Sequence, residues 1–293
     1  CLKEAHGRGD SEPANKTCMA ILRCGAFELP LTRPLVMGIV NLTPDSFSGD
    51  GLAANLDRAV EQAHQQIDAG ADLLDIGAES SRPGAAPTSL EEERRRLMPV
   101  LEALGDCGIP ISVDTYKPEV MREALAHGAS MINDIYALRM PGALDAVARS
   151  DCAICLMHMQ GDPLGMQDGP AYTSVVSTVR AFLESRVAVA GAAGIAKDRL
   201  ILDPGFGFGK TLEHNLELLR HFAQLSIAGL PLLAGISRKS MLGAITSRPV
   251  DRRLAASVAA AVLAVQRGAN IVRVHDVEET RDALAVRAAL DPD

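Results

Sequence analysis

Polar and charged side chains stand at the ends of eight short apolar runs along the chain. They are Asn41, Asp75 with Glu79, Asp114, Asn133, His158, Asp203, Ser237 with Lys239, and Arg273 with His275. One such residue usually caps the helix that follows, but capping explains poorly why every run ends this way. Aspartate and asparagine can hydrogen-bond a heterocycle, whereas arginine, lysine and histidine bind phosphates. The pattern therefore predicts one pocket for a flat, phosphorylated ligand.

Three loops add candidate chemistry to these strand ends. Residues 41–51 (NLTPDSFSGDG) form a predicted loop that carries Phe47, and residues 79–84 (ESSRPG) supply Arg82 and small hydroxyls suited to gripping phosphate. Residues 235–240 (GISRKS) follow the seventh run, where barrel enzymes favour a phosphate site. Each segment alone is weak evidence, because the simpler reading is an ordinary surface turn.

A fourth segment, residues 203–211 (DPGFGFGKT), resembles a phosphate loop but fails its spacing. A phosphate loop needs four residues between its first glycine and the GKT, and Gly205 leaves too few before Gly209. We expect these glycines to let the backbone approach a flat ligand, and Lys210 to be a solvated side chain.

The chain contains six cysteines, and only Cys152 and Cys155 have the spacing of a redox or metal motif. They fall in an apolar run that is typical of a strand, where positions three apart face opposite sides. A buried, reduced pair is the better interpretation, and the cytoplasm is the expected compartment.

Short apolar runs alternate with amphipathic stretches, which predicts βα units. The predicted strands are residues 35–43, 72–80, 109–115, 130–136, 153–159, 199–205, 231–237 and 270–275. The predicted helices are residues 55–69, 89–105, 117–127, 141–150, 173–193, 211–224, 251–267 and 276–289. Eight units favour a (β/α)8 TIM barrel, although an open doubly wound sheet stays possible. We predict a flexible tail over residues 1–26 and a single barrel domain over residues 27–293.

The formal net charge of −8 argues against nucleic acid or anionic membranes as partners. The chain also has no apolar run of the length that a membrane-spanning helix needs. A phosphorylated small molecule remains compatible with this charge, because it needs only a local cluster of cations.

The ordered motifs MGIVNLTPDSF, DIGAESSRPG, SVDT, NDI, LMHMQG, DPGFGFGKT, GISRKS and RVHD resemble those of the dihydropteroate synthases. The resemblance runs from about residue 35 to about residue 280, and so many motifs in order are specific. It implies a cytoplasmic homodimer that joins a pterin pyrophosphate to p-aminobenzoate with Mg²⁺ and that sulfonamides inhibit. One departure is Ser81, where the family usually has threonine; both residues supply a hydroxyl.

The resemblance also implies roles for individual residues. The pterin ring would contact Asp114, Asn133, Ile135, Met157, Asp203, Phe208, Gly235, Lys239 and Arg273. The pyrophosphate would contact Asn41, Arg82, Arg273 and His275, with Asn41 also near the Mg²⁺. The p-aminobenzoate site would involve Phe47, Ser81, Pro83, Ser237 and Lys239. Asp114, Asp203, Lys239 and Arg273 would be the catalytic residues.

Two other functions share the pterin pocket. A methyltetrahydrofolate-dependent methyltransferase domain would not need a pyrophosphate grip, so Arg82 and the GISRKS segment favour the synthase. A pterin-binding paralogue without catalysis would have lost its loop motifs, which are intact here. Release of pyrophosphate separates the synthase from both.

Overall fold

The computed structural model describes residues 20–42, 52–80 and 86–290 of the chain. The strands are β1 (Ile21–Cys24), β2 (Phe27–Pro30), β3 (Leu35–Asn41), β4 (Leu73–Gly77), β5 (Ile111–Asp114), β6 (Met131–Asp134), β7 (Ala153–Met157), β8 (Leu200–Asp203), β9 (Leu233–Ala234) and β10 (Ile271–Val274). The helices are α1 (Leu52–Asp68), α2 (Leu90–Ala103), α3 (Pro118–Ala126), α4 (Ala143–Ala148), α5 (Val175–Ala192), α6 (Leu212–Arg220), α7 (Ser240–Thr246), α8 (Leu254–Gln266) and α9 (Val277–Leu290).

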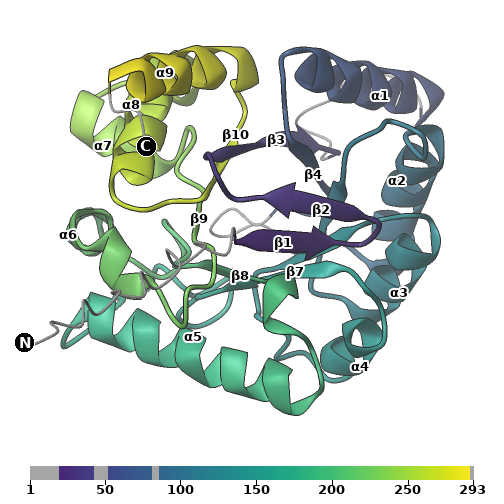
Figure 1. The fold of residues 1–293 in the computed structure, drawn as a ribbon, viewed down its shortest axis with the longest axis horizontal. Coiled ribbons are helices and arrows are strands. Elements are labelled where there is room, and N and C mark those ends of the chain that lie inside the picture. Colours follow the sequence, from purple (N-terminus) through teal and green to yellow (C-terminus); the bar gives the residue numbers. More distant parts are fainter. Residues whose placement is uncertain (1–19, 43–51, 81–85, 291–293) are drawn as a thin grey trace, which may run out of the picture.

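The strands from β3 to β10 form one parallel sheet of eight strands that closes into a barrel. Their order is β8-β7-β6-β5-β4-β3-β10-β9, and the helices surround them (Figure 1). The ring closes where Leu202 on β8 bridges Leu232 beside β9, and the Leu202 amide donates to the Pro231 carbonyl at 2.9 Å. This closure confirms the predicted barrel and excludes the open sheet.

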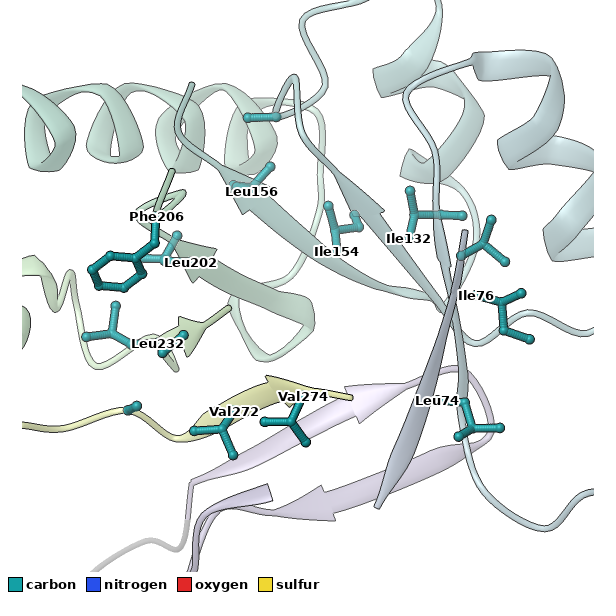
Figure 2. Close-up of a cluster of buried hydrophobic side chains, with 14 of the residues drawn as sticks. Leu74, Ile76, Ile132, Ile154, Leu156, Leu202, Phe206, Leu232, Val272 and Val274 are labelled. Carbon is teal, nitrogen blue, oxygen red and sulfur yellow. The ribbon is translucent and has the colours of Figure 1, made fainter. Parts of the chain in front are cut away.

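The outward faces of the strands carry the main hydrophobic core. Alternate residues of a strand point to opposite faces, so one set of apolar side chains meets the helices and the other set fills the barrel. Figure 2 shows the outer set, which includes Leu74, Ile76, Ile132, Ile154, Leu156, Leu202, Phe206, Leu232, Val272 and Val274. Cys152 belongs to this outer cluster and Cys155 to the inner one, and both thiols are free, so the two cysteines face opposite sides as predicted.

A hairpin of β1 and β2 covers the amino-terminal end of the barrel (Figure 1). Its buried residues Leu22 and Cys24 join the inner apolar cluster with Met37, Met131 and Cys155. The predicted tail over residues 1–26 extends too far at its carboxyl end, because Ile21–Cys24 form β1. The hairpin seals this end of the barrel with apolar side chains.

Each of the eight predicted helices is present, with shifted ends. The Ser89 hydroxyl caps α2 by accepting a hydrogen bond from the Glu92 amide at 3.2 Å. The short helix α7 was not predicted. Among the described residues, no helix is long and apolar enough to cross a membrane.

Candidate active site

The inner face of the barrel changes from apolar to polar along the strands. Its lower layer includes Leu73, Met131, Ile201 and Ile271. Two residues further along the same strands, the same face carries Asp75, Asn133, Asp203 and Arg273. A two-residue period therefore places these polar groups inside the barrel at its carboxyl-terminal end, where enzymes of this fold have their active sites.

A buried cluster of acids around one arginine forms the centre of this polar layer. The Arg273 Nε donates to Asp75 Oδ2 at 2.5 Å, and its terminal nitrogen donates to Asp114 Oδ2 at 3.1 Å. Asp75 also accepts from the Ser112 hydroxyl at 2.6 Å and from the Asn133 amide at 3.2 Å. The amide oxygen of Asn133 is buried and has no hydrogen-bond partner among the described residues, so it can accept a hydrogen bond from a ligand.

Burial controls the protonation of this cluster. It raises the pKa of Asp114 to about 7, with the Arg273 charge acting in the opposite direction and Asp75 adding to the rise. Burial also tends to lower the pKa of Arg273, but the neighbouring acids outweigh it and raise that pKa overall. Arg273 therefore stays charged, whereas Asp114 can change protonation near neutral pH.

Asp203, Lys239 and Gly235 meet on the β8–β9 side of the pocket. A β-carbon at Gly235 would lie 3.9 Å from both Asp203 Oδ2 and Lys239 Nζ, so the bare glycine leaves this space open. Burial raises the pKa of Asp203, and the Lys239 charge opposes that rise. Burial lowers the pKa of Lys239 to about 8, which keeps most of its ammonium charge at neutral pH.

Apolar side chains form the walls beside this polar layer. Ile135, Met157 and Phe208 belong to one buried cluster with Met159 and Met166. Because a flat aromatic ligand needs apolar faces and polar edges, this combination suits a heterocycle with several ring nitrogens. The structure thus brings together all nine residues predicted for the pterin ring in one end of the barrel.

The turn from residue 205 to residue 209 has no regular secondary structure, and two lysine side chains donate hydrogen bonds to its carbonyl groups. The Lys210 ammonium lies 2.9 Å from the Gly205 and Phe208 carbonyl oxygens. The Lys239 ammonium donates to the Phe206 carbonyl at 2.5 Å and lies 4.6 Å from the centre of the Phe208 ring.

The prediction that Lys210 is solvated was wrong, because this residue is only 3% exposed. A charged side chain after a glycine run gives no sequence signal of burial, since the burial depends on which carbonyl groups the turn directs inward. Lys210 holds a backbone turn and not a phosphate, which agrees with the failed phosphate-loop spacing.

The ends of β9 and β10 are tied together. The Ser237 hydroxyl lies 3.0 Å from His275 Nδ1, and the two residues reach the mouth of the barrel from adjacent strands. Arg238 adopts a left-handed φ of 57° and forms an ion pair with Asp276. Lys239 follows Arg238 directly, so this unusual backbone conformation sets where its side chain starts.

Asn41, the last residue of β3, lies half-buried at the same end of the barrel. Phe47, Ser81, Arg82 and Pro83 lie outside the described residues, so their predicted positions stay predictions. A pocket of about 220 Å³ opens over β4 to β7 and reaches Asp114 and Ile135. Its outer wall includes Tyr116 and Tyr136.

Asp75 is a site residue that sequence reasoning did not assign, although its place at a strand end was noticed. Its side chain is fully buried and contacts three other groups of the cluster. The signal was its position on the inner face of β4, two residues before Gly77, but only the barrel register shows that this face meets Arg273.

Comparisons with known proteins agree with this geometry. Residues 37–275 match the family described as pterin binding enzyme. The chain is 51% identical over 259 residues to the dihydropteroate synthase of Escherichia coli strain K12, covering 88% of this chain and 92% of that protein. It is 43% identical over 261 residues to the dihydropteroate synthase of Synechocystis, covering 88% of this chain and 90% of that protein.

Solved structures are similar over almost the whole chain. Burkholderia cenocepacia dihydropteroate synthase, complexed with 7,8-dihydropteroate, has a TM-score of 0.86 and 51% identity, covering 93% of this chain and 96% of that one. Yersinia pestis dihydropteroate synthase in a sulfonamide drug complex has a TM-score of 0.88 and 49% identity, covering 92% of this chain and 98% of that one.

Proposed function

The chain belongs to the pterin-binding enzyme family and within it to the dihydropteroate synthases, and we propose that its barrel mouth carries out their reaction. It condenses 6-hydroxymethyl-7,8-dihydropterin pyrophosphate with p-aminobenzoate, giving 7,8-dihydropteroate and pyrophosphate in folate biosynthesis. The observation that carries this assignment is the convergence of Asp114, Asn133, Asp203, Lys239 and Arg273 at the carboxyl-terminal end of one barrel. The identity to known synthases over nearly the whole chain supports it.

The pterin ring lies in the polar layer, in this proposal, with its edges against Asp114, Asn133 and Asp203. The open oxygen of Asn133 fits a ligand that offers an N–H donor. Met157, Ile135 and Phe208 cover the faces of the ring, and Gly235 leaves room beside it.

The pyrophosphate lies at the mouth, near Arg273, His275 and Asn41, with Arg82 predicted nearby. Among the described residues there is no group of three or more carboxylates, histidines or cysteines that could hold a metal by itself. Asn41 fits a Mg²⁺ that arrives on the substrate, because magnesium commonly takes most of its oxygen ligands from phosphates and water. The bound ion would neutralise charge on the leaving pyrophosphate.

The chain's own residues perform the remaining steps. Arg273 neutralises the departing pyrophosphate, while the carboxylates of Asp114 and Asp203 stabilise the positive charge that develops on the pterin. The nitrogen of p-aminobenzoate is neutral at pH 7, so its attack depends on positioning by Ser237 and Lys239 more than on a strong base. No covalent enzyme intermediate is required.

The decisive experiment measures pyrophosphate release on mixing the two substrates with Mg²⁺. We expect release only when both substrates are present, and inhibition by a sulfonamide that p-aminobenzoate relieves. Asp203→Asn should reduce kcat/KM by about 100-fold or more, because it removes a charge that acts in the transition state. Binding of the pterin without any turnover would instead indicate the inactive paralogue.

We propose a homodimer in the cytoplasm as the working form. The solvent side of α8 exposes Leu254 and Leu263 between alanines, a surface that suits burial against a second copy. Ile245 on α7 and Val286 on α9 add exposed apolar area on neighbouring helices.

A further inference from the structure

Two buried titratable residues next to the pocket, Lys210 and His158, have no part in the reaction described above. Lys210 is 3% exposed and His158 is 4% exposed. The Lys210 ammonium contacts His158 Nδ1 at 3.0 Å and the His158 carbonyl at 3.3 Å, in addition to the Gly205 and Phe208 carbonyls. An ammonium has three donors, so these acceptors use all of them.

His158 is a permanently neutral acceptor in this arrangement. Its ring packs edge-on against Phe182, with centroids 5.0 Å apart. Burial, together with the nearby charges of Lys210 and Arg139, lowers the pKa of His158 to about 2. Burial lowers the pKa of Lys210 to about 7, and its amino group can donate toward Nδ1 whether or not it is charged. The ring proton of His158 therefore resides on Nε2, and Nδ1 accepts.

The turn that Lys210 holds is tightly packed against the neighbouring backbone. A β-carbon at Gly205 would lie 2.0 Å from the His158 carbonyl, and one at Gly209 would lie 2.6 Å from the Gln160 carbonyl. The turn therefore packs directly on the segment after β7. Without the ammonium, the Gly205 carbonyl would keep only the Phe208 amide, at 3.1 Å, as a donor. The Phe208 carbonyl would lose the donor that Lys210 supplies, and the turn would have to open for this carbonyl to reach water.

Opening of this turn would affect the pocket through Phe208. Its carbonyl accepts from Lys210 while its ring packs with Ile135 and Met157 and lies under the Lys239 ammonium. The neighbouring Phe206 carbonyl accepts from Lys239. Rotation of this turn would thus move one wall of the pocket and an acceptor of Lys239 together.

We propose that Lys210, aligned by the neutral imidazole of His158, is a positioning residue that fixes the Phe208 wall and Lys239 for the pterin ring. The proposal rests on the assignment of the pterin to this cavity. Lys210 acts through the turn and does not touch the substrate.

The test replaces Lys210 by methionine, which has a similar apolar stem but no donors. At saturating p-aminobenzoate we expect the KM for the pterin pyrophosphate to rise about tenfold, a loss of roughly 1.4 kcal/mol. The KM for p-aminobenzoate, measured at saturating pterin substrate, should rise less than the pterin KM, because this substrate shares Lys239 but not the Phe208 wall and also contacts Ser237. His158→Leu should raise the pterin KM in the same way, whereas His158→Asn should preserve it, because the asparagine side chain can offer an acceptor at the Nδ1 position.

Tyr172→Phe is the matched control. The Tyr172 hydroxyl donates to the Gly209 carbonyl at 2.8 Å. This variant therefore removes a hydrogen bond to the same turn that does not involve Phe208. We expect a lower thermal midpoint and an unchanged pterin KM. If Lys210→Met and His158→Leu behave like this control, the two residues only stabilise the fold and the proposal is wrong.

Direct titration of the pterin pyrophosphate by calorimetry separates this proposal from the assigned reaction. If the wild-type protein bound the pterin but made no product, the reaction would be wrong, while weaker binding by Lys210→Met would still support the positioning role. If Lys210→Met did not fold, the comparison of His158→Leu with His158→Asn would decide.

Discussion

Asp75 shows how a single buried carboxylate can organise a ligand pocket. It has no exposed surface, and it receives hydrogen bonds from Arg273, Ser112 and Asn133. Two of these partners are proposed to contact the pterin directly. Asp75 therefore aligns two side chains of the proposed pterin site, one from β6 and one from β10.

Replacing Asp75 by asparagine should lower the free energy of unfolding by about 3 kcal/mol, because breaking a buried ion pair leaves Arg273 only partly compensated. Urea unfolding measures this change. Glu184→Gln breaks the exposed Arg180–Glu184 pair and should cost less than about 1 kcal/mol. Equal effects of the two substitutions would show that the buried cluster has no special stabilising role.

The raised pKa of Asp114, about 7, predicts a pH dependence of catalysis. As the pH falls through this value the carboxylate gains a proton and loses its charge, so kcat/KM for the pterin substrate should fall about tenfold per pH unit. Asp114→Asn should have lower activity without this acid limb. A wild-type profile that is flat from pH 5.5 to pH 8 would contradict the prediction.

A fall in pH that protonates Asp114 lowers activity but favours the folded state. The unfolded pKa of an aspartate is about 3.9, so between that pH and about 7 the folded state holds a proton that the unfolded state lacks. The contribution of Asp114 to stability is present below pH 4 and is lost as the pH rises to about 7.

At the scale of elements, the sequence predicted the eight repeated βα units better than the hairpin added before them. The alternation of apolar runs and amphipathic stretches located all eight barrel strands, because burial on both faces forces that pattern. The hairpin of β1 and β2 was missed because its strands are short and follow a polar segment. Because the carboxyl ends of the strands meet at one end of a barrel, the sequence predicted Asp114, Asn133 and Asp203 as site residues. The contacts of Asp75 and Lys210 were not predicted, because they depend on the strand register and on the geometry of the turn.

The hairpin should contribute to stability but not to catalysis. Leu22 is 1% exposed and packs against the inner apolar cluster, so Leu22→Ala should cost about 2–4 kcal/mol. Its neighbour Ile21 is 40% exposed on the other face, and Ile21→Ala should cost less than about 1 kcal/mol. Urea unfolding gives both values.

Activity of the folded Leu22→Ala protein should be unchanged, since the candidate site is at the opposite end of the barrel. A loss of activity would imply coupling between the two ends.

The molecule as a whole has two distinct ends and one unusually apolar side. The hairpin seals the amino-terminal end, so both substrates must enter through the mouth that carries the polar layer (Figure 1). The ring of helices is exposed on its outside, and α8 and its neighbours α7 and α9 present large apolar side chains to solvent, among them Leu263, Ile245 and Val286. A contact through α8 would bury this side and leave the mouth open.

This arrangement predicts that Leu263→Glu converts the proposed dimer to a monomer. Leu263 is 41% exposed on α8, and a charge there would have to be buried in the contact, which is unfavourable without a partner. Light scattering coupled to size-exclusion chromatography measures the mass of each variant. Ile21→Glu is the control, because Ile21 is similarly exposed, at 40%, but lies on the hairpin. A wild-type protein that runs as a monomer would contradict the dimer, and a dimer that survives Leu263→Glu would place the contact on another surface.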